Sequence, residues 1–308
     1  MYKENLLLFM YAETPVHWGA GSSFGVVDLP IQRERHTGYP MAQATGIKGS
    51  IRDWFESNKP TAEDKKKIEK IFGPLDHASE HAGCVAFSDA RLLLFPVRSV
   101  KGVWAYCTSR HALSRLKREL EQIGINDFPG PPVLSSYEKA FVASQSIVFK
   151  GKIVLEDCAF ESASKPNEEN SVSKIAHWLV EKKVIIEKKF WEDKINNSLV
   201  VLHDDAFRDF VQMSTIVQAH NRIDDTTGTV DDKALFYSES LPPESLLYSL
   251  VLISDPFGEK LQDFSSAAEV LKFLKDFDGK RCQMGGDSTT GKGIIATKFI
   301  FSNGGAKV

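Results

Sequence analysis

Residues Gly286 to Lys292 have the spacing of a nucleotide-binding P-loop, in which a glycine and four further residues precede Gly291 and Lys292. A working P-loop also needs a Ser or Thr after the lysine to bind Mg²⁺, and a helix whose N-terminus faces the phosphates. Here Gly293 takes the place of the Ser or Thr, and the following residues, IIATKFIF, are β-branched and aromatic, which favours a strand. The sequence therefore argues against a nucleoside triphosphate site.

Two interpretations of this glycine-rich loop remain. It is either a plain turn that joins a helix to a strand, or a loop whose unhindered N–H groups and Lys292 approach a polyanion. In the second case the residues in contact with phosphate would be Gly285, Gly286, Gly291, Lys292 and Gly293.

A local positive patch lies within residues 31–52 of a chain whose net charge is −3. Its basic members are Arg33, Arg35, Lys48 and Arg52. Such a patch suits a phosphate backbone, which needs cations but no base-reading groups. Lys48 and Arg52 are four residues apart on a predicted helix and face the same way. The alternative is that one of these cations pairs with Glu34 or Asp53.

The composition fits an ordinary globular protein, because 42% of the 308 residues are hydrophobic and 26% are charged. The four cysteines form no C-x-x-C pair and no zinc-module spacing, and scattered thiols suit a reducing cytoplasm. The apolar run from Leu6 to Tyr11 is too short to cross a bilayer and predicts a buried strand. We therefore expect a cytoplasmic protein with no membrane partner.

The elements that must position these residues alternate irregularly along the chain. Strands are predicted at 6–12, 103–108, 234–237, 246–254 and 294–301, and a strand, a turn and a second strand at 84–97. Helices are predicted at 46–55, 61–72, 112–123, 175–180 and 267–277. Residues 13–45 form a long loop rich in glycine and proline, and long ordered loops in compact domains tend to be functional. This order favours an α+β domain over a doubly wound sheet.

Five blocks of the sequence resemble, in the same order, the RAMP-superfamily backbone subunits of type III-B (Cmr) CRISPR effector complexes. The blocks are VVDLPIQRERHTGYP (26–40), GIKGSIR (46–52), LLLFPVRSVKGVWAYCT (92–108), NRIDDTTGTVDDKALFYSE (221–239) and QMGGDSTTGKG (283–293). Residues 160–200 carry no block of this kind. The resemblance covers most of the chain and is carried by separate motifs.

The resemblance implies an α+β fold with a modified RRM-like (ferredoxin-like) palm, a helical insertion and a β-hairpin thumb. Residues 1–308 would form one RAMP domain. Its thumb is expected at about 211–240, and helical insertions are expected at about 46–80 and 160–195.

The resemblance also implies a function in antiviral defence. Such subunits polymerise along a guide RNA with copies of themselves and other Cmr subunits, and each thumb displaces a nucleotide of the guide–target duplex at regular intervals. The target RNA is cut beside each displaced position in a reaction that depends on a divalent metal, expected to be Mg²⁺. Base pairing with the guide would read the sequence, so the protein holds only backbone and duplex shape.

Three residues are expected at the cleavage site. The resemblance gives the cut to Asp28, which would hold the metal ion or position the 2′-OH for attack, although a lone loop aspartate is otherwise a turn residue. His17 is expected nearby as an acid, base or phosphate contact, or else as a hydrogen-bonded structural histidine. Glu239 is expected to approach the cleavage site of a neighbouring subunit, or else to be a solvated acid at a strand end.

The remaining expectations concern RNA contacts and competing functions. His220 and Arg222, beside the thumb, are expected to contact the guide or target backbone, and the glycine-rich loop is expected to lie against guide RNA. One alternative is a guide-RNA filament subunit that does not cut. Another is a standalone endoribonuclease that processes guide precursors.

Overall fold

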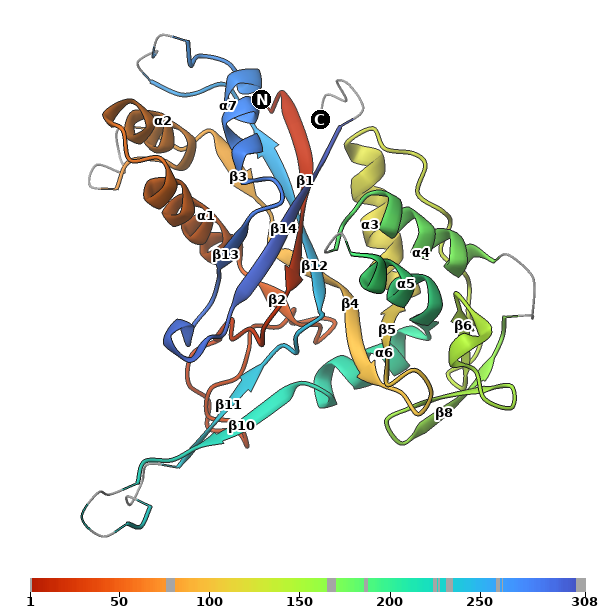
Figure 1. Ribbon diagram of the computed structural model, residues 1–308. Helices are drawn as coiled ribbons and strands as arrows, with labels where there is room; N and C mark the ends of the chain where they lie inside the picture. Colours follow the sequence, from red (N-terminus) through yellow and green to blue (C-terminus); the bar gives the residue numbers. More distant parts are fainter. Residues whose placement is uncertain are drawn as a thin grey trace.

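The N-terminal strand lies inside a large mixed sheet in the computed structural model of this chain (Figure 1). The structure describes residues 2–75, 81–164, 170–185, 188–223, 226, 228–230, 235–258, 261 and 263–302. Within those residues, twelve strands form the sheet, in the order β13-β14-β1-β12-β4-β5-β9-β6-β8-β7, with β2 added to β4 and β3 added to β12. Most neighbours are antiparallel, whereas the pairs β5–β9 and β6–β8 are parallel.

The strands of this sheet are mostly short. They are β1 (Glu4–Ala12), β2 (Met41–Ala42), β3 (Val85–Phe87), β4 (Ala90–Arg98), β5 (Trp104–Ser109), β6 (Lys139–Val142), β7 (Lys152–Leu155), β8 (Cys158–Ser162), β9 (Leu199–Leu202), β12 (Leu246–Ile253), β13 (Arg281–Gln283) and β14 (Ile294–Phe301). The α-helices are α1 (Ala44–Asn58), α2 (Ala62–Phe72), α3 (Arg110–Gln122), α4 (Ser171–Glu181), α5 (Lys189–Ser198), α6 (Asp204–Met213) and α7 (Ala267–Leu274). Short 3-10 helices lie at Gln145–Ile147, Lys275–Phe277 and Ser288–Thr290.

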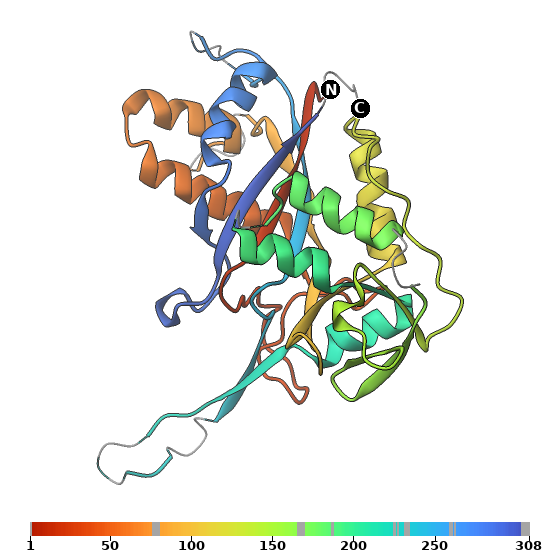
Figure 2. The same cartoon turned by 45° about the vertical axis from the view of Figure 1, so that its right-hand side comes forward.

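The apolar run of β1 is buried on both sides of the sheet. Leu6, Leu8 and Met10 face one core, which includes residues of α1, α2 and α7, and alternate residues face a second core with α3, α4 and α5. Figures 1 and 2 show these two helical layers on opposite sides of the central strands. The predicted α+β character is therefore confirmed. No helix of the described part of the chain is long and apolar enough to span a membrane.

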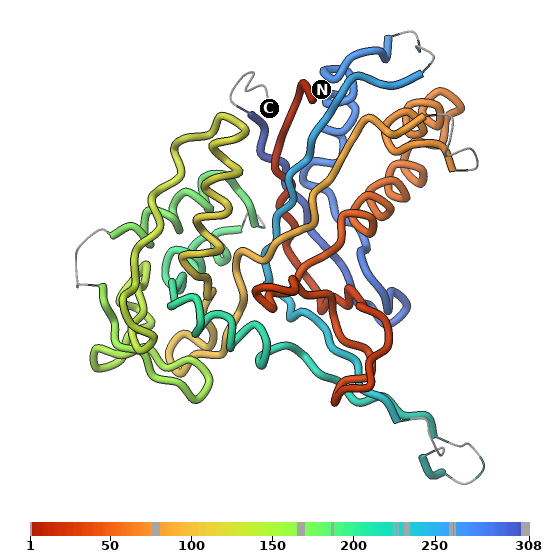
Figure 3. Tube along the Cα trace, turned by 180° about the vertical axis from the view of Figure 1, so that it is seen from behind, coloured from red at the N-terminus to blue at the C-terminus, as the bar shows by residue number. Residues whose placement is uncertain are grey.

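A separate two-stranded hairpin projects from the body of the molecule. It pairs β10 (Ile216–His220) with β11 (Phe236–Ser240), directly after α6, and all three ribbon and tube views show it extending away from the sheet (Figures 1, 2 and 3). Ala234, where the sequence predicts the returning strand to begin, lies outside the described residues, as do residues 224–225, 227 and 231–233 between the two strands. The base of this hairpin lies beside the long N-terminal loop, which brings the candidate residues together.

Candidate active site

Asp28 is attached directly to the base of the projecting hairpin. Its Oδ2 accepts a hydrogen bond from the backbone amide of Tyr237 at 2.7 Å. The next residue, Leu29, donates its amide to the Tyr237 carbonyl at 3.0 Å and accepts from the Glu239 amide at 2.9 Å. The loop therefore runs as a short parallel addition to β11, and Figure 3 shows the N-terminal loop lying against the hairpin base.

The residues before Asp28 form a narrow excursion with an exposed apolar tip. Its two sides are joined by hydrogen bonds from the Ala20 amide to the Pro30 carbonyl at 2.9 Å and from the Ser23 amide to the Asp28 carbonyl at 2.8 Å. Phe24 and Val26 at the tip are 110% and 94% exposed. Asp28 is itself partly exposed at the base of the tip, so its carboxylate is accessible from solvent.

His17 lies in the same site and contacts Glu239, which is two residues after Tyr237 on β11. Its Nδ1 is 2.6 Å from the backbone carbonyl oxygen of Glu239. Because a carbonyl oxygen only accepts, Nδ1 must carry the proton, and Nε2 of the neutral ring then has a free lone pair. A Cβ added at Gly19 would lie 2.8 Å from this Nε2, so only a glycine leaves room for the ring at that point.

Glu239 is buried, with 6% of the residue exposed, and both of its carboxylate oxygens are bonded. Oε1 accepts from Arg33 Nη2 at 2.5 Å and from Thr215 Oγ1 at 2.7 Å, and Oε2 accepts from the Ile31 amide at 3.0 Å. The interpretation of Glu239 as a solvated strand-end acid is therefore wrong. The approach of Glu239 to a neighbouring subunit stays a prediction, but both of its carboxylate oxygens already have hydrogen-bond partners within this chain.

Two of the four cations of the positive patch are used inside the protein. Besides Glu239, Arg33 donates from Nη1 to the carbonyls of Gly38 at 2.9 Å and Val211 at 2.8 Å. Arg52 donates from Nε to Glu56 at 2.7 Å and from Nη1 to the Gly73 carbonyl at 2.8 Å. The sequence could not show this, because three of these five partners lie more than twenty residues away in the chain.

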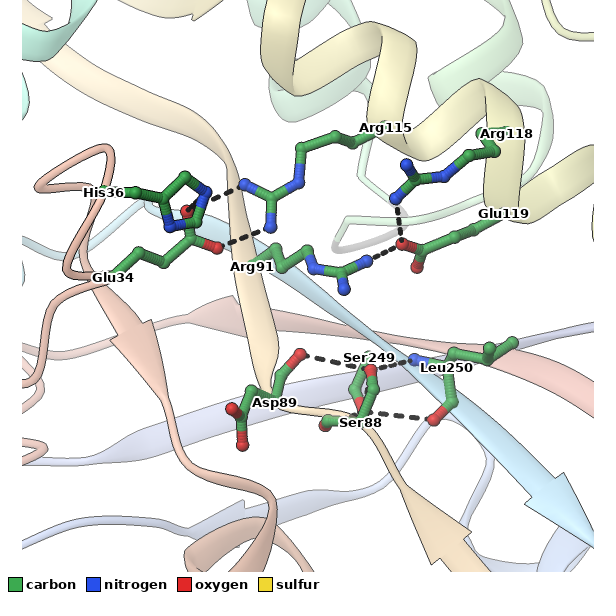
Figure 4. Close-up of polar contacts among 10 residues, drawn as sticks. All are labelled: Glu34, His36, Ser88, Asp89, Arg91, Arg115, Arg118, Glu119, Ser249 and Leu250. Carbon is green, nitrogen blue, oxygen red and sulfur yellow. Dashed lines mark hydrogen bonds and ion pairs between the residues drawn. The ribbon is translucent and has the colours of Figure 1, made fainter.

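The alternative pairings expected for the patch are also not formed among the described residues. Glu34 is bound instead by Arg115 of α3, with Nη1 and Nη2 at 2.8 and 2.6 Å from its two oxygens (Figure 4). Burial is the largest single effect and would raise the pKa of Glu34, but the hydrogen bonds from Arg115 and Thr37 and the charges of Arg115 and His36 together outweigh it and hold that pKa below its usual range. Glu34 is therefore a charged anchor of the loop.

Arg35 and Lys48 are the members of the patch that stay available. Arg35 is exposed, and Lys48 is half-buried near the start of α1, where burial lowers the pKa of its ammonium group. Neither has an ion-pair partner within the described residues. Beside Lys48, a Cβ added at Gly46 or Gly49 would meet no atom within 4 Å, so the helix backbone is open to close approach there.

The two candidates at the end of β10 differ in their surroundings. His220 stacks on Phe236 across the hairpin, with ring centroids 4.9 Å apart, and its Nε2 is 2.7 Å from Ser238 Oγ. Arg222 follows β10 and is exposed on the projecting part of the hairpin. The structure thus places His220 on the same strand pair as the partners of Asp28 and His17.

The glycine-rich loop joins β13 to β14, and not a helix to a strand as expected. A strand follows Lys292, as predicted, so the helix of a P-loop is absent here. Lys292 is buried and its Nζ is 2.9 Å from Asp287 Oδ2, and this contact lowers the pKa of Asp287, with smaller contributions from His17 and His220. The loop therefore belongs to the same cluster as His17.

The loop's amides do not form the expected open cradle. Gly286 donates its N–H to the His17 carbonyl and Gly293 to the Pro15 carbonyl, both at 2.8 Å, and Gly291 donates to Ser288 at 3.0 Å. A Cβ at Gly285 would lie 2.6 Å from the His17 carbonyl oxygen. These glycines first serve close packing against the segment that carries His17, and contact of the loop with RNA stays a prediction.

The donor atoms of the site fit a divalent metal only in a limited way. Among the described residues, no three His, Cys, Asp or Glu side chains are grouped so that they could hold a metal ion. Asp28 offers one accessible carboxylate. Mg²⁺ is commonly held by one or two carboxylates together with substrate phosphates and water, so Asp28 fits such a site when RNA supplies the other oxygens.

Comparisons with known proteins place these features in a family. A model of the RAMP superfamily matches residues 9–296. The CRISPR system Cmr endoribonuclease Cmr4 of Pyrococcus furiosus is 38% identical over 306 residues, 97% of each chain. A crystal structure of oligomeric Cmr4 from that organism matches with a TM-score of 0.72 at 30% identity, over 98% of this chain and 99% of the other. A chain of the type III-B Cmr-β complex bound to cognate target RNA has a TM-score of 0.70 at 22% identity, over 97% and 98%, which is a likeness of fold.

Proposed function

Because the chain belongs to the RAMP superfamily and, within it, to the Cmr4 family, we propose that it is the guide-RNA-binding backbone subunit of a type III-B CRISPR effector and cleaves target RNA. The observation that carries the proposal is the bond between Asp28 and the base of the projecting hairpin. A relative is named as an endoribonuclease, and a related chain occurs in a complex with target RNA. The accessible carboxylate of Asp28 is the group best placed to act on such a substrate.

We assign the proposed palm and thumb to two parts of the fold. The large sheet with its two helical layers would be the palm, of the RRM-like kind, and the β10–β11 hairpin would be the thumb. The thumb would enter the guide–target duplex and displace a nucleotide, and copies of the subunit would line up along the guide. The crystal structure of oligomeric Cmr4 supports association between copies.

The mechanism follows from the attachment of Asp28 to the thumb. Displacement of a nucleotide frees the RNA backbone to bend toward in-line geometry, in which the 2′-OH lies opposite the leaving oxygen. Asp28 is bonded to Tyr237 of β11, in the hairpin that would be the thumb, so it would meet the phosphate next to the displaced nucleotide. Its carboxylate would position the 2′-OH or accept its proton.

His17 would support the same step as an acid or base. Its Nδ1 is held by the Glu239 carbonyl, which fixes the ring and its tautomer. Nε2 is then the atom that would exchange a proton with RNA, because Gly19 has no Cβ to occupy the space beside it. When bound, a divalent ion held by Asp28 would neutralise charge on the phosphate.

Guide binding would rest on backbone contacts. Arg35 and Lys48 are the available cations of the positive patch, and the open face of α1 around Gly46 and Gly49 lets a phosphate chain come close. Arg222 and the surface of the glycine-rich loop would add to this path. Sequence would be read by base pairing and not by these side chains.

The test is target cleavage by the assembled complex. A labelled target that matches the guide should give a ladder of evenly spaced products with the native subunit and no ladder with Asp28→Asn, while assembly and guide binding persist. A ladder of normal rate from Asp28→Asn would mean that another subunit cuts. Cleavage of precursor RNA by the isolated protein would support a guide-processing enzyme instead.

A further inference from the structure

Two adjacent residues of opposite charge tie the Asp28 loop to two different parts of the molecule. Arg33 is paired with Glu239 on β11, at the hairpin base. Glu34 is paired with Arg115 on α3, as Figure 4 shows. The two pairs have similar burial, with side chains 23% and 8% exposed in the first and 14% and 9% in the second, given in the order arginine then glutamate. They therefore offer a matched comparison within one loop.

The Arg33–Glu239 pair joins the loop that carries Asp28, the segment that carries His17 and the start of the hairpin. The Glu239 carboxylate binds the loop through Ile31 and the start of the hairpin through Thr215, and its backbone carbonyl holds His17. Arg33 reaches the end of α6, from which the hairpin emerges, through the Val211 carbonyl. Both strands of the hairpin and the loop carrying Asp28 are thus fixed to one buried ion pair.

No part of Glu239 is left to act on RNA. Both carboxylate oxygens have partners within the chain, and only 8% of the side chain is exposed. A buried carboxylate that binds three segments acts through the geometry of those segments. A buried charge whose partner is removed is left uncompensated, so either change to this pair should loosen the attachment of the Asp28 loop to the base of the hairpin.

We propose that the Arg33–Glu239 pair is a positioning device, which makes the seating of the hairpin and the alignment of Asp28 a single event. Glu239 is then a positioning residue and not a catalytic one. The inference rests on the proposed function, since the event that it controls is cleavage beside the displaced nucleotide. The pair would ensure that target RNA is cut only where the hairpin is seated on the duplex.

The test is a double-mutant cycle on the cleavage rate of the complete complex with guide RNA. Glu239→Gln and Arg33→Gln should each slow cleavage on the order of 100-fold, the size expected from a misplacement of about 1 Å. The double variant should be no slower than either single variant, because the two residues act through each other. The pH–rate profile should keep its shape at a lower rate in all three variants.

A second measurement separates hairpin insertion from cutting. A fluorescent base placed at the displaced position of the target should report the same displacement in Glu239→Gln as in wild type, while cleavage falls. Loss of that signal in parallel with cleavage would mean that the pair only folds the hairpin, and the proposal would be overturned.

The control is the second anchor of the same loop. Glu34→Gln and Arg115→Gln should leave the cleavage rate close to wild type, because this pair contacts α3 and not the hairpin. An equal loss in these controls would show general loosening of the loop and contradict the proposal. Additive losses in the Arg33 and Glu239 cycle, or a changed pH–rate profile in Glu239→Gln, would show that Glu239 acts on RNA directly.

A milder variant covers the case in which the charge variants fail to assemble. Thr215→Val removes one hydrogen bond to Glu239 and keeps the ion pair, so it should slow cleavage about 10-fold, the size expected for one hydrogen bond to a charged carboxylate, with an unchanged pH–rate profile. A wild-type rate in this variant would count against the proposal. Asp28→Asn is assayed beside it, and normal cutting by that variant would refute the proposed function and not the coupling alone.

Discussion

The carboxylate of Asp28 accepts a hydrogen bond from the backbone amide of Tyr237 at 2.7 Å, which joins the candidate catalytic residue to β11 at the base of the projecting hairpin. Asp28→Asn keeps an oxygen for this bond and removes the charge. We expect it to lower target cleavage by about 100-fold or more, the range for loss of an acid–base group, with little change in stability. Asp28→Ala should lower cleavage by the same factor and should also remove the hydrogen bond from the Tyr237 amide.

Hydrogen exchange at the Tyr237 amide checks this difference. The amide should stay protected in wild type and in Asp28→Asn, and should exchange faster in Asp28→Ala, because its only acceptor in the described structure is then absent. Equal protection in Asp28→Ala would contradict the attachment of the loop to the hairpin. Cleavage is measured on the same samples with guide and labelled target.

Gly19→Ala is expected to impair cleavage through His17. The new Cβ would lie 2.8 Å from Nε2 of His17, so the ring must move and its bond to the Glu239 carbonyl is strained. Cleavage should fall about 10- to 100-fold, while the free energy of unfolding falls by only about 1 kcal/mol, the net value of one hydrogen bond.

Gly130→Ala is the control for this substitution. A Cβ at Gly130 meets no atom within 4 Å, so cleavage should be unchanged. If Gly19→Ala cut at the wild-type rate, His17 would be a structural histidine, which is the alternative that the sequence left open. Rates and thermal melts of both variants decide between the two.

Much of the framework could be predicted because its signals are local. The apolar run of β1 predicted a buried strand, and the pattern at 61–72 predicted the helix that the structure has at Ala62–Phe72. The strands β6, β7 and β9 were not predicted, because each has only four residues, too few to show an alternation of apolar and polar side chains. Helix α6 was missed although its buried residues Phe207, Phe210 and Val211 have helical spacing.

The site itself was only partly predictable, for a reason that concerns distance along the chain. The motif around Asp28 could be found locally, but Arg33 was assigned to RNA because its partner Glu239 lies 206 residues away. The glycine-rich loop was likewise expected to present free amides, and it uses them on Pro15 and His17. Local charge and glycine content indicate what a segment can bind, whereas the fold decides whether it binds protein or ligand.

Lys48 and Arg52 lie one turn apart on α1 and should differ in guide binding. Lys48 has no ion-pair partner within the described residues, whereas Arg52 is held by Glu56 and the Gly73 carbonyl. Lys48→Gln should weaken guide binding and lower the slope of log affinity against log salt by about 0.7, the value for one contact to single-stranded RNA. Arg52→Gln should lower the melting temperature and leave that slope unchanged.

Guide-RNA titrations at several salt concentrations check this pair of expectations. The two variants remove the same charge from the same helix, so a general electrostatic effect would change both slopes alike. Equal slopes for Lys48→Gln and wild type would remove Lys48 from the RNA path. A reduced slope for Arg52→Gln would mean that its internal contacts open when RNA binds.

Glu244→Gln is expected to stabilise the protein above neutral pH. Burial raises the pKa of Glu244 from 4.5 to about 7, and its Oε2 has no hydrogen-bond partner among the described residues. Between these two values the folded state binds more protons than the unfolded chain, so this group lowers the free energy of unfolding as the pH rises from 4.5 to about 7, and the loss persists above 7. Gln has no charge to desolvate.

The melting temperature of Glu244→Gln should therefore exceed that of wild type at pH 8 and match it near pH 4.5, where the carboxyl group is protonated in the folded state. Both side chains sit on the same backbone, with φ at 70°, so conformational strain cancels in the comparison. Glu161→Gln, at an exposed position of β8, is the control and should show no gain that depends on pH. A gain of equal size at both pH values would attribute the effect to packing, because a desolvated charge can destabilise the fold only at a pH where the group is ionised.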